Sequence, residues 1–262
     1  MSENRYFATN EEDTIESERL GYLESCYDPI TQSHIQQLGL AHDVTCLEVG
    51  AGRGSIARWL AENVSRTGTV TATDTDLKFL ADIHARNIEV RQHDITKDTL
   101  EKERYDLVHC RFLLMHLNDF QVALQNMAQA VRPGGWLIVE ELDYITKIEV
   151  NIHDNPGLKR LHEEGERLLT MLQNSGLVDV YFGRNVRALM EGLGVENVGH
   201  VGNVPVYHGG ELMALFDKMP FLAASRNFDI PDRDKIVEVF SDPNNYFVGP
   251  TLFSSWGQKP TV

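Results

Sequence analysis

The chain has 262 residues, of which 42% are hydrophobic and 24% charged, a composition typical of a globular protein with its own core. Its 24 basic and 39 acidic side chains give a formal net charge of −15, which disfavours nucleic acid and acidic membrane surfaces as partners. No run approaches the ~18 apolar residues of a membrane span. The N-terminus also lacks the features of a signal peptide, so we expect a cytoplasmic protein.

The three cysteines, Cys26, Cys46 and Cys110, show no paired spacing. Cys46 and Cys110 fall inside segments that read as strands, so we expect buried free thiols rather than disulfides or metal ligands. No cluster of Asp, Glu or His shows the spacing of a metal site, and we predict no bound metal.

The N-terminal forty residues predict an arm followed by helices. Residues 1–19 are polar and are interpreted as an arm or lid. Apolar and aromatic residues then recur at helical spacing up to residue 40. The pair Asp28-Pro29 predicts a division into two helices, because the residue before a proline disfavours helical geometry.

The middle of the chain alternates between strand and helix patterns, which is typical of a mostly parallel sheet. Strands are predicted at 45–49, 69–73, 88–91, 105–110 and 136–140, helices at 56–64, 77–85 and 118–131, and a sharp turn at 132–135. Further helices are expected at 158–174, 184–191, 211–221 and 233–240, and extended segments at 196–207 and 251–256. The stretch 208–248 therefore reads as an insertion between the last two strands that could form a wall of a substrate pocket.

The most informative motif is the segment 46–54, Cys-Leu-Glu-Val-Gly-Ala-Gly-Arg-Gly, where an apolar strand runs into glycines and then a helix. Such a turn brings backbone N–H groups against a nucleotide-like ligand. A dinucleotide-binding turn, G-x-G-x-x-G, would need its third glycine at Ser55. The observed pattern is instead E-x-G-x-G-x-G, starting at Glu48.

This pattern resembles motif I of the class I S-adenosylmethionine (SAM) methyltransferases, and later segments continue the resemblance in order. They are Val-x-Ala-Thr-Asp ending at Asp74, Asp-Leu-Val-His-x-Arg ending at Arg111, Pro-Gly-Gly-Trp-Leu at 133–137 and Trp-Gly-x-x-Pro at 256–260. The sequence of these motifs is similar to that of a bacterial small-molecule or natural-product subgroup over about residues 19–260. The resemblance implies an α/β fold: a Rossmann-like, seven-stranded, mostly parallel sheet with helices on both faces. It also implies an N-terminal helical lid and a helical insertion before the last strand.

We accordingly expect three parts. Residues 1–40 form the N-terminal arm and lid helices, and 41–145 the SAM-binding core. Residues 146–262 supply substrate-cap helices and the closing strands of the same sheet. The cofactor would be SAM, with S-adenosyl-L-homocysteine as product.

Cofactor contacts are expected where successive strands end. Asp74 could accept both ribose hydroxyls, with Asp76 as the nearby competitor. Asp94 could accept from the adenine amino group, although a helix cap before Thr96 explains it equally well. The resemblance implies that Tyr22 closes over the cofactor; packing of an aromatic residue against the sheet is the alternative. The expected cofactor-binding residues are Tyr22, Glu48, Gly50, Ala51, Gly52, Asp74, Thr75, His93, Asp94, Ile95, Cys110 and Arg111.

Methyl transfer requires alignment of nucleophile, methyl and sulfur, and a general base only when the nucleophile is a hydroxyl or a similar acid. Asp143 and His153 are the leading catalytic candidates, against the simpler interpretations of a turn acid and a surface histidine. His116 is interpreted as a core or capping residue in preference to a general base. Arg53 could face the SAM carboxylate or solvent and is left without a role.

The resemblance implies a SAM-dependent methyltransferase (EC 2.1.1 type) of secondary metabolism, acting at O, N or C of a small apolar or aromatic metabolite. One alternative is a SAM-binding enzyme that couples methylation to cyclisation or rearrangement, or replaces it. Another is a non-catalytic SAM-binding partner protein, and a dinucleotide oxidoreductase ranks last. A detached N-terminal arm is compatible with a homodimer or a higher homo-oligomer.

Overall fold

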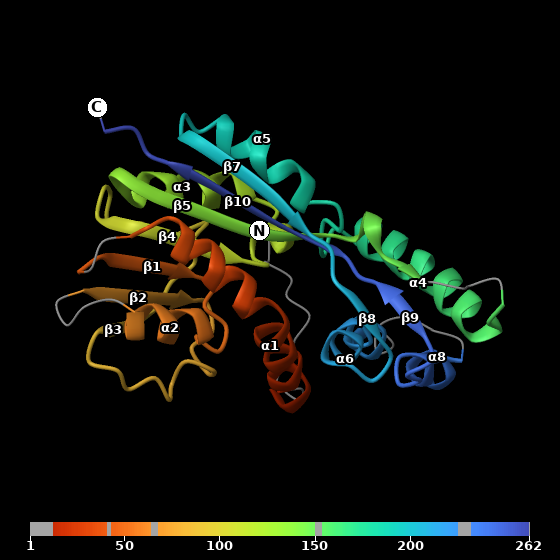
Figure 1. The fold of residues 1–262 in the computed structure, drawn as a ribbon. Helices are drawn as coiled ribbons and strands as arrows, with labels where there is room; N and C mark the ends of the chain where they lie inside the picture. Colours follow the sequence, from red (N-terminus) through yellow and green to blue (C-terminus); the bar gives the residue numbers. More distant parts are fainter. Residues whose placement is uncertain (1–12, 41–42, 64–67, 150–153, 225–231, 262) are drawn as a thin grey trace.

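The computed structural model describes residues 13–40, 43–63, 68–149, 154–224 and 232–261 (Figure 1). The first half contains α1 (Asp13–Gln37), β1 (Thr45–Val49), α2 (Ser55–Asn63), β2 (Thr69–Asp74), β3 (Ile88–Gln92), β4 (Tyr105–Arg111), the 3₁₀ helix η2 (Leu114–His116), α3 (Phe120–Ala130) and β5 (Val131–Asp143). The second half contains η3 (Tyr144–Thr146), β6 (Ile148–Glu149), α4 (Pro156–Ser175), η4 (Gly183–Asn185), α5 (Val186–Glu191), β7 (Glu196–Asn203), β8 (Val206–His208), α6 (Leu212–Asp217), α7 (Met219–Ala224), α8 (Arg233–Val239), β9 (Tyr246–Val248) and β10 (Thr251–Gln258).

The central sheet has seven strands in the order β3-β2-β1-β4-β5-β10-β7. The strands from β3 to β5 are mutually parallel, and β10 runs antiparallel to both of its neighbours. The alternation of strands and helices predicted a mostly parallel sheet, and the family resemblance implied seven strands; both expectations are confirmed. Because β1, β2 and β4 are parallel, their carboxyl ends share one edge of the sheet.

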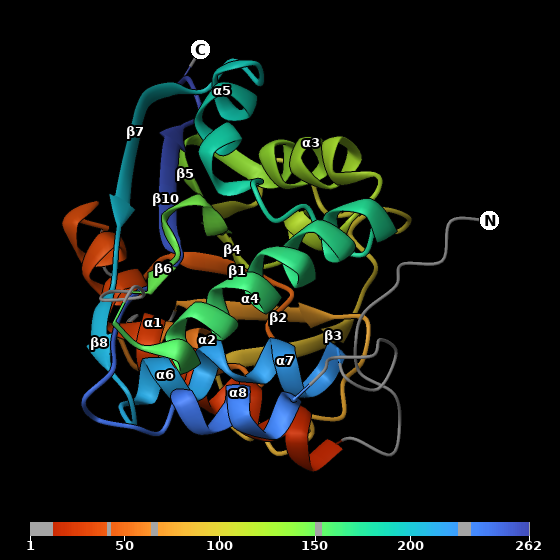
Figure 2. The same cartoon turned by 90° about the vertical axis from the view of Figure 1, so that its right-hand side faces the viewer.

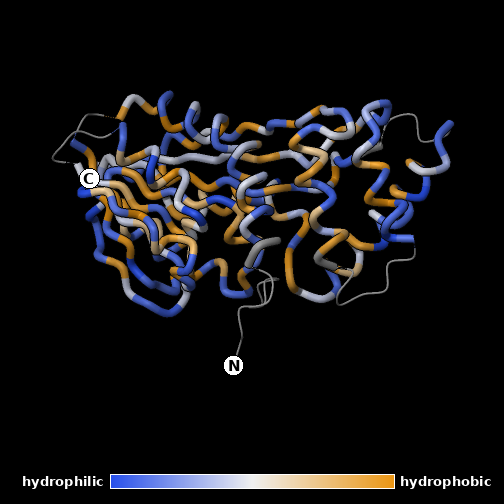
Figure 3. Tube along the Cα trace, turned by 90° about the horizontal axis from the view of Figure 1, so that it is seen from below, coloured by the Kyte–Doolittle hydropathy of each residue, from blue (hydrophilic) through white to orange (hydrophobic). Residues whose placement is uncertain are grey.

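Helices cover both faces of the sheet, and each face has its own hydrophobic core. On one face α2 and the C-terminal half of α1 pack on β1 and β2 through residues such as Ile35, Ile56 and Val70. On the other face α3 packs on β4 and β5, and α5 packs on β7 and β10 (Figure 2). Hydrophobic residues follow the strands in the interior, while the outer bends are mostly hydrophilic (Figure 3). In a sheet covered on both faces, the side chains that point alternately to the two faces are all buried.

A smaller region lies beyond the carboxyl ends of the strands and consists of α4, α6, α7, α8 and a second sheet (Figure 1). This sheet has three strands in the order β6-β9-β8 and was not predicted from the sequence. Its strands have two or three residues each, too few to show an alternating pattern. No helix among the described residues is long and apolar enough to cross a membrane.

Helix α1 corrects the prediction of two helices, because it continues through Pro29. An interior proline removes one backbone hydrogen bond and costs about 3 kcal/mol. Side chains flanking the proline hold the helix against the sheet: Asp28 binds Arg111, and Thr31 binds Glu140. Tyr27 is fully buried between them. Tertiary contacts thus outweigh the local preference.

The helix predicted at 77–85 is also wrong. The segment forms successive turns, with Leu80 N–H donating to the Leu77 carbonyl (2.9 Å) and Ile83 N–H to the Leu80 carbonyl (3.0 Å). Leu80 is nevertheless buried, and with Ile83 it packs beside Gly54. The apolar spacing therefore reflects burial of two turns rather than a helical face.

Candidate active site

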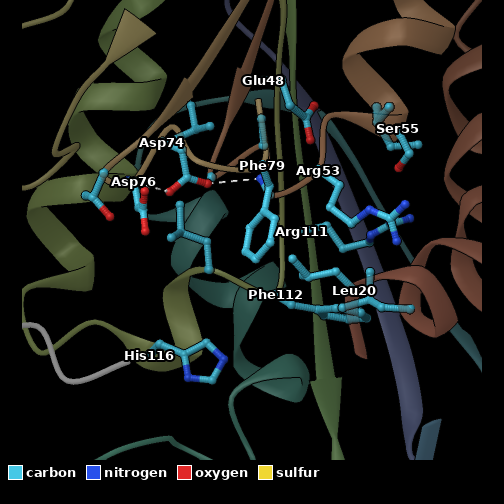
Figure 4. A pocket seen from close by; sticks show the side chains of 18 of the residues that line it. Leu20, Glu48, Arg53, Ser55, Asp74, Asp76, Phe79, Arg111, Phe112 and His116 are labelled. Carbon is cyan, nitrogen blue, oxygen red and sulfur yellow. Dashed lines mark hydrogen bonds between the residues drawn. The ribbon is translucent and has the colours of Figure 1, made fainter. Parts of the chain in front are cut away.

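A cavity of about 350 Å³ lies where β1, β2 and β4 end, and α1 forms its opposite wall (Figure 4). The residues that line it come from three sources: α1, the strand ends, and the segment after β4. They include Leu20, Leu23 and Glu24 of α1, residues 48–53 at the end of β1, residues 74–76, 78 and 79 at the end of β2, residues 93–95 after β3, and residues 111–113 with His116 and Leu117. The cavity thus occupies the strand edge where open α/β sheets bind ligands.

The glycine turn is shaped by hydrogen bonds to β2. The N–H groups of Gly50 and Ala51 both donate to the Thr73 carbonyl at 2.9 Å, and Gly50 has a φ of +70°. Gly54 has a φ of +76°, and a Cβ there would lie 2.5 Å from Ile83 Cδ1. Both positions therefore need glycine, one for its backbone angle and one also for space.

Asp74 lies at the centre of the cavity wall and binds the glycine turn. Its Oδ2 accepts from Gly52 N–H at 3.0 Å, and its Oδ1 accepts from Asp76 N–H at 3.2 Å. Burial raises the pKa of Asp74, although these backbone donors partly offset the effect. Further donors, such as a pair of ligand hydroxyls, would favour the ionised carboxylate.

His93, Asp94 and Ile95 line the cavity side by side at the end of β3. His93 is 6% exposed, and neither ring nitrogen has a hydrogen-bond partner within the described part of the chain. Asp94 accepts from Thr96 N–H (3.0 Å) and from Lys97 Nζ (2.5 Å). Burial opposes the charge of Asp94, but these bonds outweigh it and lower its pKa. Asp94 therefore closes a local turn as well as lining the cavity.

Arg53 joins the glycine turn to α1. Its Nη1 donates to the Ser17 carbonyl at 3.0 Å, and its Nε lies 3.8 Å from Glu24 Oε2. A Cβ at Gly21 would lie 2.8 Å from this Nη1, so the glycine leaves room for the guanidinium. Arg53, to which the sequence analysis assigned no role, thus connects two walls of the cavity.

The wall after β4 is mainly apolar, with Phe112, Leu113 and Leu117. Phe112 has a φ of +53°, which is a strained angle for a bulky residue. Its ring packs edge-on against Tyr27, with centroids 5.0 Å apart. His116 points into the same part of the cavity (Figure 4), and burial lowers its pKa to about 4. Its imidazole is therefore neutral near pH 7.

Of the expected cofactor-binding residues, all but Tyr22 and Cys110 line the cavity. Tyr22 packs against the core cluster, and Cys110 is fully buried inside β4, where burial raises its thiol pKa well above the usual value. Arg111 lines the cavity, but its guanidinium is directed toward α1, where it donates to Asp28 (2.6 Å) and Thr31 (2.8 Å).

Of the two catalytic candidates, the structure describes only Asp143. Asp143 is fully buried, outside the cavity lining, and both of its oxygens accept from Arg184. Its Oδ1 also accepts from Ile145 N–H at 3.0 Å, which closes the turn into η3. His153 lies outside the described residues. A catalytic role for either stays a prediction.

Several cavity residues were missed from the sequence, among them Leu20, Phe79 and Phe112. Apolar residues carry no chemical signal of their own, and only the fold shows that they face a ligand space. Also missed was buried Asp217 of α6, which accepts from Tyr207 and lies 3.7 Å from Lys147 Nζ. Among the described residues, no group of three or more His, Cys, Asp or Glu side chains could hold a metal ion.

Comparisons with known proteins point to one family. A family model described as a methyltransferase domain matches residues 18–200. Methyltransferase str2 of Strobilurus tenacellus is 25% identical over 183 residues, covering 68% of this chain and 63% of the relative. The ubiquinone biosynthesis O-methyltransferase of Hydrogenovibrio crunogenus is 31% identical over 135 residues, covering 49% and 54%. The chain thus spans between about half and two thirds of the length of these two relatives.

Solved structures share the fold at low identity. Haemonchus contortus phosphoethanolamine N-methyltransferase 2, in complex with S-adenosyl-L-methionine, superposes with a TM-score of 0.60 at 14% identity, covering 99% of this chain and 60% of that chain. Geranyl diphosphate C-methyltransferase of Streptomyces coelicolor has a TM-score of 0.55 at 11% identity, covering 97% and 86%. At these identities the likeness shows the fold alone.

Proposed function

The chain belongs to the methyltransferase domain family, and from this premise we propose that it is a SAM-dependent methyltransferase of EC 2.1.1 type. It moves a methyl group to O, N or C of a small, apolar or aromatic metabolite by in-line displacement. The observation that carries the proposal is the cavity at the strand edge, where the partly buried Asp74 carboxylate meets the glycine turn through Gly52 N–H.

The residues present fit SAM. Asp74 would accept the ribose hydroxyls, which would add further donors to its partly buried carboxylate. The unbonded ring nitrogens of His93, together with Asp94, would meet polar atoms of the adenine. Glu48, which also lines the cavity, would face the ammonium group. The glycine turn lets the backbone approach the ligand closely.

When bound, SAM supplies a methyl group that its sulfonium has already activated. The residues of the chain then need to orient the acceptor and exclude water. Adenine and ribose assigned to the β2 and β3 ends leave the wall from Phe112 to Leu117 for the methyl group and the acceptor. This wall is apolar apart from His116, which suits an apolar or aromatic acceptor. As a neutral imidazole, His116 could accept the proton of a hydroxyl acceptor.

The finer assignments rest on the sequence resemblance. They are the bacterial natural-product subgroup, a place in secondary metabolism, a cytoplasmic location and a homo-oligomer. We propose these assignments as the basis for choosing which acceptor molecules to test, beginning with phenols and other small aromatic metabolites.

The test is methyl transfer itself. The purified protein is incubated with methyl-labelled SAM and a panel of aromatic and apolar acceptors, and product and S-adenosylhomocysteine are quantified together. A transferase forms them in a one-to-one ratio. An acceptor converted without S-adenosylhomocysteine would instead indicate cyclisation or rearrangement. Binding of SAM without conversion of any acceptor in a broad panel would favour a non-catalytic SAM-binding protein.

A further inference from the structure

A row of ionisable side chains crosses the central sheet directly beneath the cavity. His109 of β4 is fully buried, and its Nδ1 lies 2.7 Å from Glu48 Oε2 of β1. Its Nε2 lies 3.4 Å from Glu140 Oε2 of β5. Strand register brings the three together, because Glu48 pairs with His109, and His109 pairs with the residue two positions before Glu140. Two buried carboxylates therefore flank one imidazole.

The row continues from Glu140 into α1. Glu140 Oε1 accepts from Ser254 Oγ of β10 at 2.6 Å and lies 3.1 Å from His34 Nδ1, while its Oε2 accepts from Thr31. The Thr31 hydroxyl accepts in turn from Arg111 Nη1 at 2.8 Å. The same helix carries Leu20, Leu23 and Glu24 of the cavity wall. One bonded row thus links Glu48, in the cavity floor, to the helix that forms the opposite wall.

The charges in this row depend on His109. Burial alone would lower the pKa of His109, but Glu48 and Glu140 outweigh it and raise the pKa to about 9. Burial would raise the pKa of Glu140, yet the bonds from His109 and His34 lower it well below the usual range. The imidazolium therefore places a positive charge between the two buried carboxylates, and for Glu140 it favours the ionised form.

A purely structural interpretation is that the row only ties β1, β4 and β5 together. Continuous hydrogen bonding within the sheet and two hydrophobic cores already do this. Apolar residues of similar volume often stabilise a core as well as buried ions do. The position of Glu48, 4% exposed and lining the cavity, indicates what the ions add: a negative charge held at a fixed place in the ligand site.

We propose that His109 is a positioning residue for the cofactor site. It holds the Glu48 carboxylate in place and oriented toward the ligand's ammonium group. Through Glu140, which also binds Thr31, it fixes the position of α1 relative to the same site. This inference rests on the proposed function, because it assigns the ligand as SAM or S-adenosylhomocysteine. No bond is made or broken in it; the role is electrostatic and geometric.

The experiment measures S-adenosylhomocysteine binding by isothermal titration from pH 6.5 to pH 9 for the wild type and for His109→Gln. The glutamine side chain cannot carry the positive charge, so the Glu48 and Glu140 carboxylates lose the cation that lies between them. We expect affinity at pH 7 to fall at least tenfold, about 1.4 kcal/mol. The ratio of variant to wild-type Kd then shrinks toward pH 9, because His109 of the wild type gives up its own proton near that pH. Using the ratio cancels titration of the ligand's own amino group.

Two further variants separate positioning from loss of stability. Val108→Ala removes an equally buried side chain of β4 on the other face of the sheet, and its Kd ratio should not vary with pH. Glu48→Gln should lose affinity by itself, and adding His109→Gln to it should cost little more, because both act through one carboxylate. If His109→Gln fails to fold, histidine-labelled wild type is titrated by NMR. One imidazolium should then persist above pH 8 and shift when S-adenosylhomocysteine binds.

The proposal is overturned if His109→Gln binds within twofold of wild type at every pH, if its Kd ratio is as flat as that of Val108→Ala, or if no persistent imidazolium responds to ligand. Absence of binding to the wild type would instead defeat the proposed function. The two failures are therefore distinguishable from the first titration.

Discussion

Replacing Glu141 by glutamine should stabilise the protein increasingly as pH rises. Glu141 is fully buried, and its Oε1 accepts from the N–H groups of Leu113 (3.0 Å) and Leu114 (2.6 Å). Its Oε2 has no hydrogen-bond partner among the described residues. Burial raises the pKa from 4.5 to about 8, the backbone donors only partly offsetting it. The folded protein therefore keeps a proton near pH 7 that the unfolded chain has lost.

The sign and size follow from this difference in protons. A carboxyl whose folded pKa is raised has no effect on stability below pH 4.5 and destabilises progressively as pH rises toward 8. Each pH unit within that window costs about 1.4 kcal/mol, so the wild type should lose about 2 kcal/mol relative to Glu141→Gln between pH 6 and pH 8. The contribution of His109 to the free energy of unfolding also falls as pH rises from its unfolded pKa of 6.5 to its folded pKa of about 9. This fall is the same in both proteins and cancels in their difference.

Urea unfolding at pH 6, 7 and 8 measures the free energy of unfolding of the two proteins. Exposed Glu163→Gln on α4 removes the same charge from the surface and should run parallel to the wild type. A difference between Glu141→Gln and wild type that is constant from pH 6 to pH 8 would refute the reasoning, because Glu141 would then be ionised throughout.

Three backbone substitutions give further checks by chemical denaturation. At Phe112, with φ of +53°, glycine should be more stable than alanine by about 1 kcal/mol, although both lose the ring; alanine proving more stable would refute backbone strain there. Pro29→Ala should stabilise by up to about 3 kcal/mol, because the new N–H can donate to the Ser25 carbonyl, and no gain would mean that α1 is kinked there already. Gly54→Ala should destabilise by about 1–3 kcal/mol through its backbone angle and its contact with Ile83, and Ile83→Val should recover part of the loss but not all.

Much of the fold follows from local patterns, because the buried strands are short apolar runs bounded by turns. The prediction for β1 at 45–49 coincides with the observed strand, and β2, β3 and β4 are each one residue longer than predicted. The errors occur where distant contacts override local preference. Asp28 and Thr31 bind the sheet on either side of Pro29 and keep α1 continuous through it, and burial of Leu80 beside Gly54 imitates a helical pattern.

The candidate site divides in the same way. Glycines and acids at strand ends could be located from spacing, because the parallel sheet brings those ends to one edge. The resemblance implied a lid helix, but the residues of α1 that line the cavity and the row behind Glu48 could not be located. His109 and Glu140 lie 31 residues apart, and Thr31 lies 109 residues from Glu140, so only the three-dimensional fold brings them together.

The most direct test of the central claim is calorimetric titration of the wild type, Asp74→Asn and Asp76→Asn with S-adenosylhomocysteine, alongside NADH. Both acids line the cavity, but only Asp74 binds the glycine turn. We predict wild-type binding in the micromolar range, about 8 kcal/mol. Asp74→Asn should lose about 1.5–3 kcal/mol of it, as expected for hydrogen bonds to a charged group, and Asp76→Asn should lose less. Binding of NADH without S-adenosylhomocysteine, or equal affinity of Asp74→Asn and wild type, would contradict the account.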